Sequence, residues 1–111
     1  MAPSQIRTLV LNGTQRIGLA AQVSAALAKR GFAIQHLDKP WVANSPKIAR
    51  ATTIYFDATQ SKARVAANLL RHRFQPSTVV RASTKPIRQL AEHAGRPLLV
   101  VVLGSSFQGL S

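Results

Sequence analysis

An uninterrupted run of apolar residues, Leu98 to Leu103, lies near the carboxyl end of the chain. Successive side chains of a strand point to opposite faces of a sheet, so a strand of this composition is apolar on both faces. Such a strand is stable where other elements cover the sheet on both sides. The run therefore predicts a central strand of a layered domain. It is far shorter than the ~20 residues that a membrane-spanning helix needs.

Shorter apolar stretches alternate with helical patterns along the rest of the chain. The periodicities predict strands over 9–11, 32–37, 52–56 and 78–82 and helices over 16–30, 60–73 and 86–94. Because each helix follows a strand, right-handed crossovers and some parallel pairing are expected. We predict a single α/β domain over residues 1–111, with a core from about 6 to 110. It combines a mixed four- or five-stranded sheet with two main helices and a short third helix.

The helix boundaries carry their own signals. Lys29 and Arg30 stand in the last turn of the first helix, where cations complement the helix dipole, and Gly31 suits a left-handed cap. The second helix is expected to start from a cap at Thr59 or Ser61. Helical spacing places its predicted apolar side on Ala63, Ala66, Leu69 and Leu70.

A tight polar turn, residues 12–18, joins the first strand to the first helix. Asn12-Gly13 favours a turn because both residues tolerate positive φ. The glycine spacing resembles a phosphate-binding loop, but Leu19 and Ala20 stand where a P-loop needs Lys and Ser or Thr. Gln15 occupies the place of the middle glycine in the dinucleotide fingerprint. Both nucleotide-binding motifs are therefore excluded.

Two interpretations of this turn remain. In the first, Asn12, Gly13 and Gly18 only shape the chain reversal. In the second, free backbone N–H groups at the start of the helix, flanked by Thr14 and Arg16, hold an anion. The first interpretation requires no ligand and is the one we favour.

Charge is the outlying feature of the composition. Lys and Arg number 15 against 3 Asp and Glu, a formal net charge of +12. Such an excess attracts polyanions, whether nucleic acid, anionic lipid or acidic polysaccharide, without choosing among them. The second helix concentrates it, because no acidic residue balances its cations. The residues predicted to contact an anion are Lys62, Arg64, Asn68, Arg71, Arg73 and Arg16; the alternative is an ordinary solvated face.

Catalytic chemistry finds little support. Asp38, Asp57 and Glu92 are the only acids and none forms a local pair, while the three histidines share no ligand spacing. The absence of cysteine excludes disulfides and thiolate chemistry. We predict no catalytic residue, no metal site and no cofactor.

Residues 38–51 show neither helical nor strand periodicity and are predicted to form a loop. Two roles are open for Trp41, which belongs to this loop. Its side chain packs back onto the domain, or it is exposed and stacks against a sugar or base.

The order of several short motifs resembles one family. They are Val10-Leu11-Asn12-Gly13-Thr14, Gly18-Leu19-Ala20, Leu27 with Gly31-Phe32, Thr53-Ile54-Tyr55-Phe56 and Val100-Val101-Val102-Leu103-Gly104. Together they resemble the LytR C-terminal domain family, a module of LytR/CpsA/Psr-type bacterial cell-wall proteins. The resemblance runs from about Ile6 to Leu110. It implies an extracytoplasmic domain of cell-envelope biogenesis, and it supplies no established catalytic residue.

Three classes of function follow. The favoured one is a non-catalytic module that docks anionic wall glycopolymer, peptidoglycan, a lipid-linked precursor or a partner envelope protein. A basic nucleic-acid-binding domain is the alternative, and a protein anchor that uses the sheet edge is a third. An extracytoplasmic location is expected if the chain is part of a tethered protein, and a cytoplasmic one if it is complete.

Overall fold

The computed structural model of the chain describes residues 2–37 and 50–110. Within them, a short 3-10 helix at Pro3–Gln5 precedes five strands and three helices. In chain order these are β1 (Arg7–Asn12), α1 (Leu19–Lys29), β2 (Ala33–Ile34), β3 (Thr53–Phe56), α2 (Ala63–Arg71), β4 (Val79–Ala82), α3 (Lys85–Glu92) and β5 (Leu99–Leu103). The predicted α/β class is confirmed. Trp41 and most of the predicted loop lie outside the described residues.

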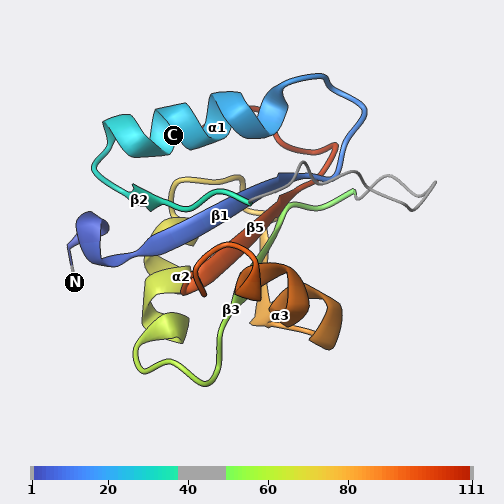
Figure 1. The fold of residues 1–111 in the computed structure, drawn as a ribbon. Helices are drawn as coiled ribbons and strands as arrows, with labels where there is room; N and C mark the ends of the chain where they lie inside the picture. Colours follow the sequence, from blue (N-terminus) through green and yellow to red (C-terminus); the bar gives the residue numbers. More distant parts are fainter. Residues whose placement is uncertain (1, 38–49, 111) are drawn as a thin grey trace.

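The strands form one mixed sheet in the order β2-β1-β5-β3-β4 (Figure 1). β5 is parallel to β1 and antiparallel to β3. β2 pairs in parallel with β1, and β4 in parallel with β3. The sheet therefore consists of a parallel group, β2, β1 and β5, joined to a second parallel pair, β3 and β4, that runs the opposite way.

Apolar layers cover both faces of β5. Leu99, Val101 and Leu103 belong to a cluster with the buried residues of α1 and α2. Val100, on the other face, belongs to a second cluster, against which Ile87 and Leu90 of α3 pack. We call these two sides the α1/α2 face and the α3 face. The prediction of a central strand covered on both sides is confirmed.

The first helix begins at Leu19, three residues later than predicted. Gly18 takes the N-cap position with a left-handed φ of 74°, which keeps the preceding turn out of the helix. At the other end Gly31 has a φ of +91°. The Phe32 N–H donates to the Leu27 carbonyl over 3.1 Å, so the predicted glycine cap is confirmed.

β2 is much shorter than the strand predicted over 32–37. Its pairing with β1 covers only Ala33 and Ile34, followed by one further hydrogen bond from the Gln35 N–H to the Thr8 carbonyl. Phe32 and Ile34 do pack against the α1/α2 face, as the alternation indicated. Alternation reports which side chains face inward, and it does not report how far a partner strand stays alongside.

The start and one face of α2 differ from the prediction. Lys62 is the N-cap, with a φ of 67° and no side-chain capping bond. The predicted cap, Thr59, instead donates its hydroxyl to Asp57 Oδ1 over 2.6 Å. Leu69, predicted on the apolar side, is 44% exposed, whereas Leu70 is fully buried. The sheet and its neighbours leave room for a narrow buried stripe, and the helix fills it mainly with alanines.

No helix in the described parts of the chain is long and apolar enough to cross a membrane.

Candidate functional site

The predicted anion-contact residues of α2 all lie at the surface. Lys62, Arg64, Asn68, Arg71 and Arg73 are exposed, and no residue of the helix is acidic. Helical spacing places Arg64, Asn68 and Arg71, which lie within α2, on one flank. Lys62 is the N-cap, in a left-handed conformation, and Arg73 follows two residues after the helix end. Cations thus lie along one flank of α2 and at both of its ends.

Two of these guanidinium groups also have partners within the protein. Arg71 donates from Nε to the Thr78 carbonyl and from Nη2 to the Pro76 carbonyl, each over 3.0 Å. It therefore fixes the connection from α2 to β4. The Arg64 guanidinium lies 5.4 Å from the centre of the Phe56 ring, a cation–π contact that leaves its N–H groups open to solvent.

The turn after β1 is held by the side chain of Asn12. Its Oδ1 accepts hydrogen bonds from the Thr14 N–H and hydroxyl, and its Nδ2 donates to the Arg16 carbonyl over 2.6 Å. Neither Asn12 nor Gly13 has a positive φ, so the expected reason for the turn is wrong. An Asx turn, in which the side chain replaces a backbone acceptor, produces it instead.

Two of the backbone N–H groups in this turn, which precede the helix start, have internal acceptors. The Thr14 N–H bonds to Asn12 and the Arg16 N–H bonds to the Thr14 hydroxyl. The Arg16 side chain donates to the Phe107 carbonyl over 2.6 Å and lies 5.9 Å from the centre of the Phe107 ring. These contacts tie the turn to the carboxyl-terminal segment.

A charged cleft that the sequence did not reveal lies at the carboxyl ends of β3 and β4. The chain leaves β3 for α2 on one face of the sheet and leaves β4 for α3 on the other. Open α/β sheets commonly bind ligands where adjacent parallel strands send their connections to opposite faces. The cavity here has a volume of about 220 Å³ and is lined by Asp57, Ser83, Arg88, Glu92, Arg96 and Val100, among others. We call it the β3–β4 cleft.

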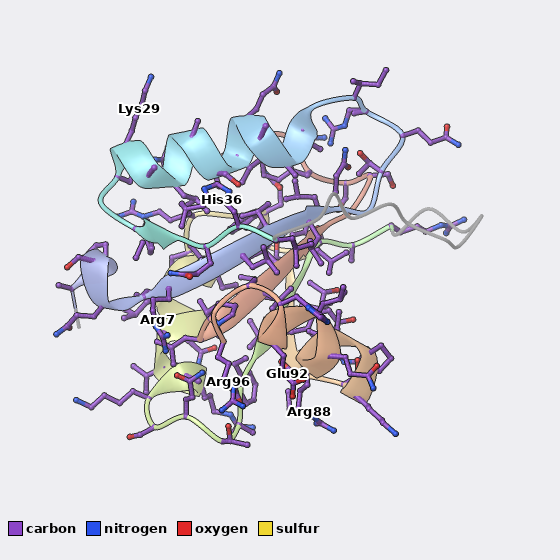
Figure 2. The ribbon with its side chains drawn as sticks, viewed as in Figure 1. Arg7, Lys29, His36, Arg88, Glu92 and Arg96 are labelled. Carbon is purple, nitrogen blue, oxygen red and sulfur yellow. The ribbon has the colours of Figure 1, made fainter. Side chains whose placement is uncertain are left out.

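Gln60, which is outside the lining of this cleft, connects two of the segments that line it. Its Nε2 donates to Asp57 Oδ2 over 2.9 Å and to the Arg96 carbonyl over 3.2 Å. Its Oε1 accepts from Arg7 Nη2 over 2.8 Å, and Arg7 Nη1 reaches the Gly95 carbonyl. The start of β1, the loop after β3 and the turn before β5 are therefore held together, and Figure 2 shows Arg7, Arg88, Glu92 and Arg96 at this end of the molecule.

The Asp57 carboxylate is ionised and held in place. Partial burial alone would raise its pKa, but the hydrogen bonds from Thr59 and Gln60 and the charge of Arg88 together outweigh burial, so the pKa lies below its usual 3.8. A carboxylate whose pKa is lower in the folded state stabilises the fold above its unfolded pKa. That stability is lost as the pH falls through the folded pKa.

Asp57→Asn should therefore remove part of the acid sensitivity of the protein. We expect wild-type stability to decline as the pH falls below about 4, the unfolded pKa of an aspartate, and the variant to show a shallower decline there and lower stability at neutral pH. Urea denaturation followed by circular dichroism at a series of pH values measures both effects. Parallel curves for the two proteins in the acid range would contradict this role of Asp57.

Part of the cleft has a signal in the sequence. Asp57-x-Thr59 has the spacing of an Asx turn, and Arg88 and Glu92 have the i, i+4 spacing of neighbours on a helix. Nothing local joins these two segments to each other or to Arg96. Among the described residues no group of three His, Cys, Asp or Glu side chains could hold a metal ion.

Comparison with known proteins places this fold in a family. The family model described as LytR cell envelope-related transcriptional attenuator, LytR_C, matches residues 5–107. The chain belongs to the LytR_C family. The resemblance drawn from the motif order is thus confirmed over nearly the whole chain. LytR_C domains are found in cell-envelope proteins, and residues 5–107 form a domain of this family.

A solved structure shares the fold of this LytR_C domain. It is the soluble domain of a conserved hypothetical secreted protein from Mycobacterium marinum, with a TM-score of 0.67 and 23% sequence identity. The match covers 99% of this chain and 66% of that one. No curated protein sequence gives a significant match.

Proposed function

We propose that this LytR_C domain is a non-catalytic binding module of the bacterial cell envelope that docks an anionic wall glycopolymer on α2. The observation that carries the proposal is a set of exposed cations on and next to this helix: Arg64 within it, Lys62 at its N-cap and Arg73 two residues after its end. The helix offers no acidic residue beside them. Membership of a cell-envelope family supports the setting. The secreted origin of the structural neighbour supports an extracytoplasmic location.

A repeating polyanion suits this surface better than a single small anion. The cations lie along α2 and at both of its ends, so successive charges of a polymer can contact them in turn, and each exposed contact alone is weak. The three acidic residues of the chain can neutralise at most three of its fifteen cations, which leaves a net +12 to attract the polymer. Peptidoglycan, a lipid-linked precursor and a partner envelope protein are the alternative envelope ligands for this surface.

Nucleic acid has less support. Single-stranded RNA is commonly read by aromatic side chains that stack bases on one sheet face. Tyr55 packs with the α3 face and Phe56 with the α1/α2 face, so these neighbours form no common platform.

Cosedimentation with cell-wall material tests the proposal. We expect the domain to be retained at low salt by peptidoglycan that carries its anionic glycopolymer, and to be released at about 1 M salt, where the Debye length falls to about 3 Å. Peptidoglycan stripped of the polymer should retain much less. Absence of retention on polymer-bearing walls at low salt would rule out the polymer-binding form, and equal retention on stripped walls would identify peptidoglycan itself as the partner.

A further inference from the structure

The β3–β4 cleft contains charges of both signs in one small cavity. Its lining includes the guanidinium groups of Arg88 and Arg96 and the carboxylates of Asp57 and Glu92. The carboxylates disfavour a phosphate dianion, and the guanidinium groups disfavour a metal cation. A ligand that carries both a carboxylate and an ammonium group matches the lining.

Two residues of the cleft occupy locally unfavourable positions. Arg96 has a φ of +52°, in the left-handed region that costs a residue with a Cβ atom free energy. Glu92 is the last residue of α3, where a negative charge opposes the helix dipole. Neither side chain makes a hydrogen bond with any other described residue, yet both line the same cavity. An unfavourable backbone conformation at a cleft, here that of Arg96, is a recognised mark of a functional site, and the unfavourably placed charge of Glu92 lies in the same cleft.

The other two charges are held in fixed orientations. Arg88 donates from Nη1 to the Ser83 carbonyl over 3.0 Å, which leaves the rest of its guanidinium for a ligand. Asp57 accepts three hydrogen bonds, two on Oδ1 and one on Oδ2, so one lone pair of Oδ2 and the full negative charge remain. Ligand binding would therefore not have to reorganise these two groups.

We propose that the β3–β4 cleft binds a small zwitterion, an amino acid or a dipeptide, with its carboxylate on Arg88 and Arg96 and its ammonium group on Glu92 and Asp57. The volume of about 220 Å³ suits a ligand of this size and is below that of typical drug-sized sites. This site is separate from the cations of α2. Its existence does not depend on polymer binding.

Titration of the whole chain, followed by ¹⁵N–¹H NMR, tests the proposal with matched probes. Alanyl-alanine carries both charges, N-acetyl-alanyl-alanine only the carboxylate, and alanyl-alanine amide only the ammonium group. We expect alanyl-alanine to shift the amide signals of Ser83, Ala91 and Val100 with a dissociation constant of about 1 mM, and each blocked dipeptide to bind at least tenfold more weakly. Absence of these shifts would overturn the proposal, as would equal binding of inorganic phosphate or of a blocked dipeptide.

Variants separate a binding role from a structural one. Arg96→Gly should weaken alanyl-alanine binding at least tenfold while keeping or raising the thermal unfolding temperature, because glycine adopts this φ without strain. Glu92→Gln should weaken binding similarly. Arg81→Gln removes an exposed cation of β4 outside the lining and should leave binding unchanged. Wild-type affinity in Arg96→Gly, or an equal loss in Arg81→Gln, would overturn the assignment.

Discussion

Replacing Gly104 with alanine should destabilise the protein by about 3 kcal/mol or more. Gly104 follows β5, and a Cβ atom built on it would lie 2.4 Å from the Ala51 carbonyl carbon and 2.6 Å from the Arg50 and Ala51 carbonyl oxygens. All three atoms belong to the backbone, so no side-chain rotation can relieve the overlap. The end of β5 and the backbone of residues 50 and 51 must therefore move apart.

Hydrogen bonds make that separation costly. The Gly104 N–H donates to the Thr52 hydroxyl over 3.0 Å, in a buried position, and the Ser106 N–H donates to the Arg50 carbonyl over 2.9 Å. Moving the backbones apart would leave these groups unsatisfied in addition to opening the core. The steric and polar costs therefore add.

Urea denaturation followed by circular dichroism measures the effect, and Gly109→Ala supplies a comparison without steric overlap. Gly109 has a φ of +104° and nothing within 4 Å of its ideal Cβ position, so Gly109→Ala carries a conformational cost of about 1–2 kcal/mol that Gly104→Ala lacks, and no overlap. Equal destabilisation by the two substitutions would contradict this prediction, because it would show that the backbone of residues 50 and 51 moves away from the new Cβ atom at little cost.

Reversing the charge of α2 should weaken glycopolymer binding about 100-fold, equivalent to about 2.7 kcal/mol. The variant carries Lys62→Glu, Arg64→Glu and Arg73→Glu. Each substitution changes the charge by two units, so the formal net charge falls from +12 to +6. Repulsion then replaces three attractive contacts at one surface. Arg71 is left intact because its bonds to the Pro76 and Thr78 carbonyls hold the chain, and its loss would confuse folding with binding.

A control with the same net charge decides whether location matters. Lys29→Glu, Arg81→Glu and Lys85→Glu change exposed cations away from α2 and also lower the formal net charge to +6. Cosedimentation at several salt concentrations compares the two triple variants. We expect the control to lose less than tenfold, since it reduces only the long-range attraction. Equal losses would show that polymer binding depends only on the net charge of the domain and that α2 is not the docking surface.

The secondary structure was largely readable from the sequence because each element is marked by a local pattern. The left-handed cap at Gly31 and the all-apolar run of β5 are confirmed in place. The errors lie where a pattern permits two partners. Thr59 could cap α2 or bond to Asp57. It bonds to Asp57, because the carboxylate accepts both the Thr59 N–H and its hydroxyl.

The candidate sites differ in how far they could be foreseen. The cations on and next to α2 lie close together in the sequence, so the helical pattern alone predicts that they are exposed, while their contact with an anion stays a prediction. The β3–β4 cleft draws Asp57, Arg88 and Arg96 from three separate segments. No spacing in the chain relates these segments, because their meeting depends on the order and direction of the strands.

The sequence by itself determined the element types, most of the apolar faces and the family, since periodicity, glycine positions and motif order are properties of neighbouring residues. Only the tertiary structure decided that β3 and β4 run opposite to β1 and β5, and that their connections leave on opposite faces. It also decided that Gly104 lies under the backbone of residues 50 and 51. The physical reason is that long-range packing selects which faces and edges meet, and a local pattern constrains only what each of them offers.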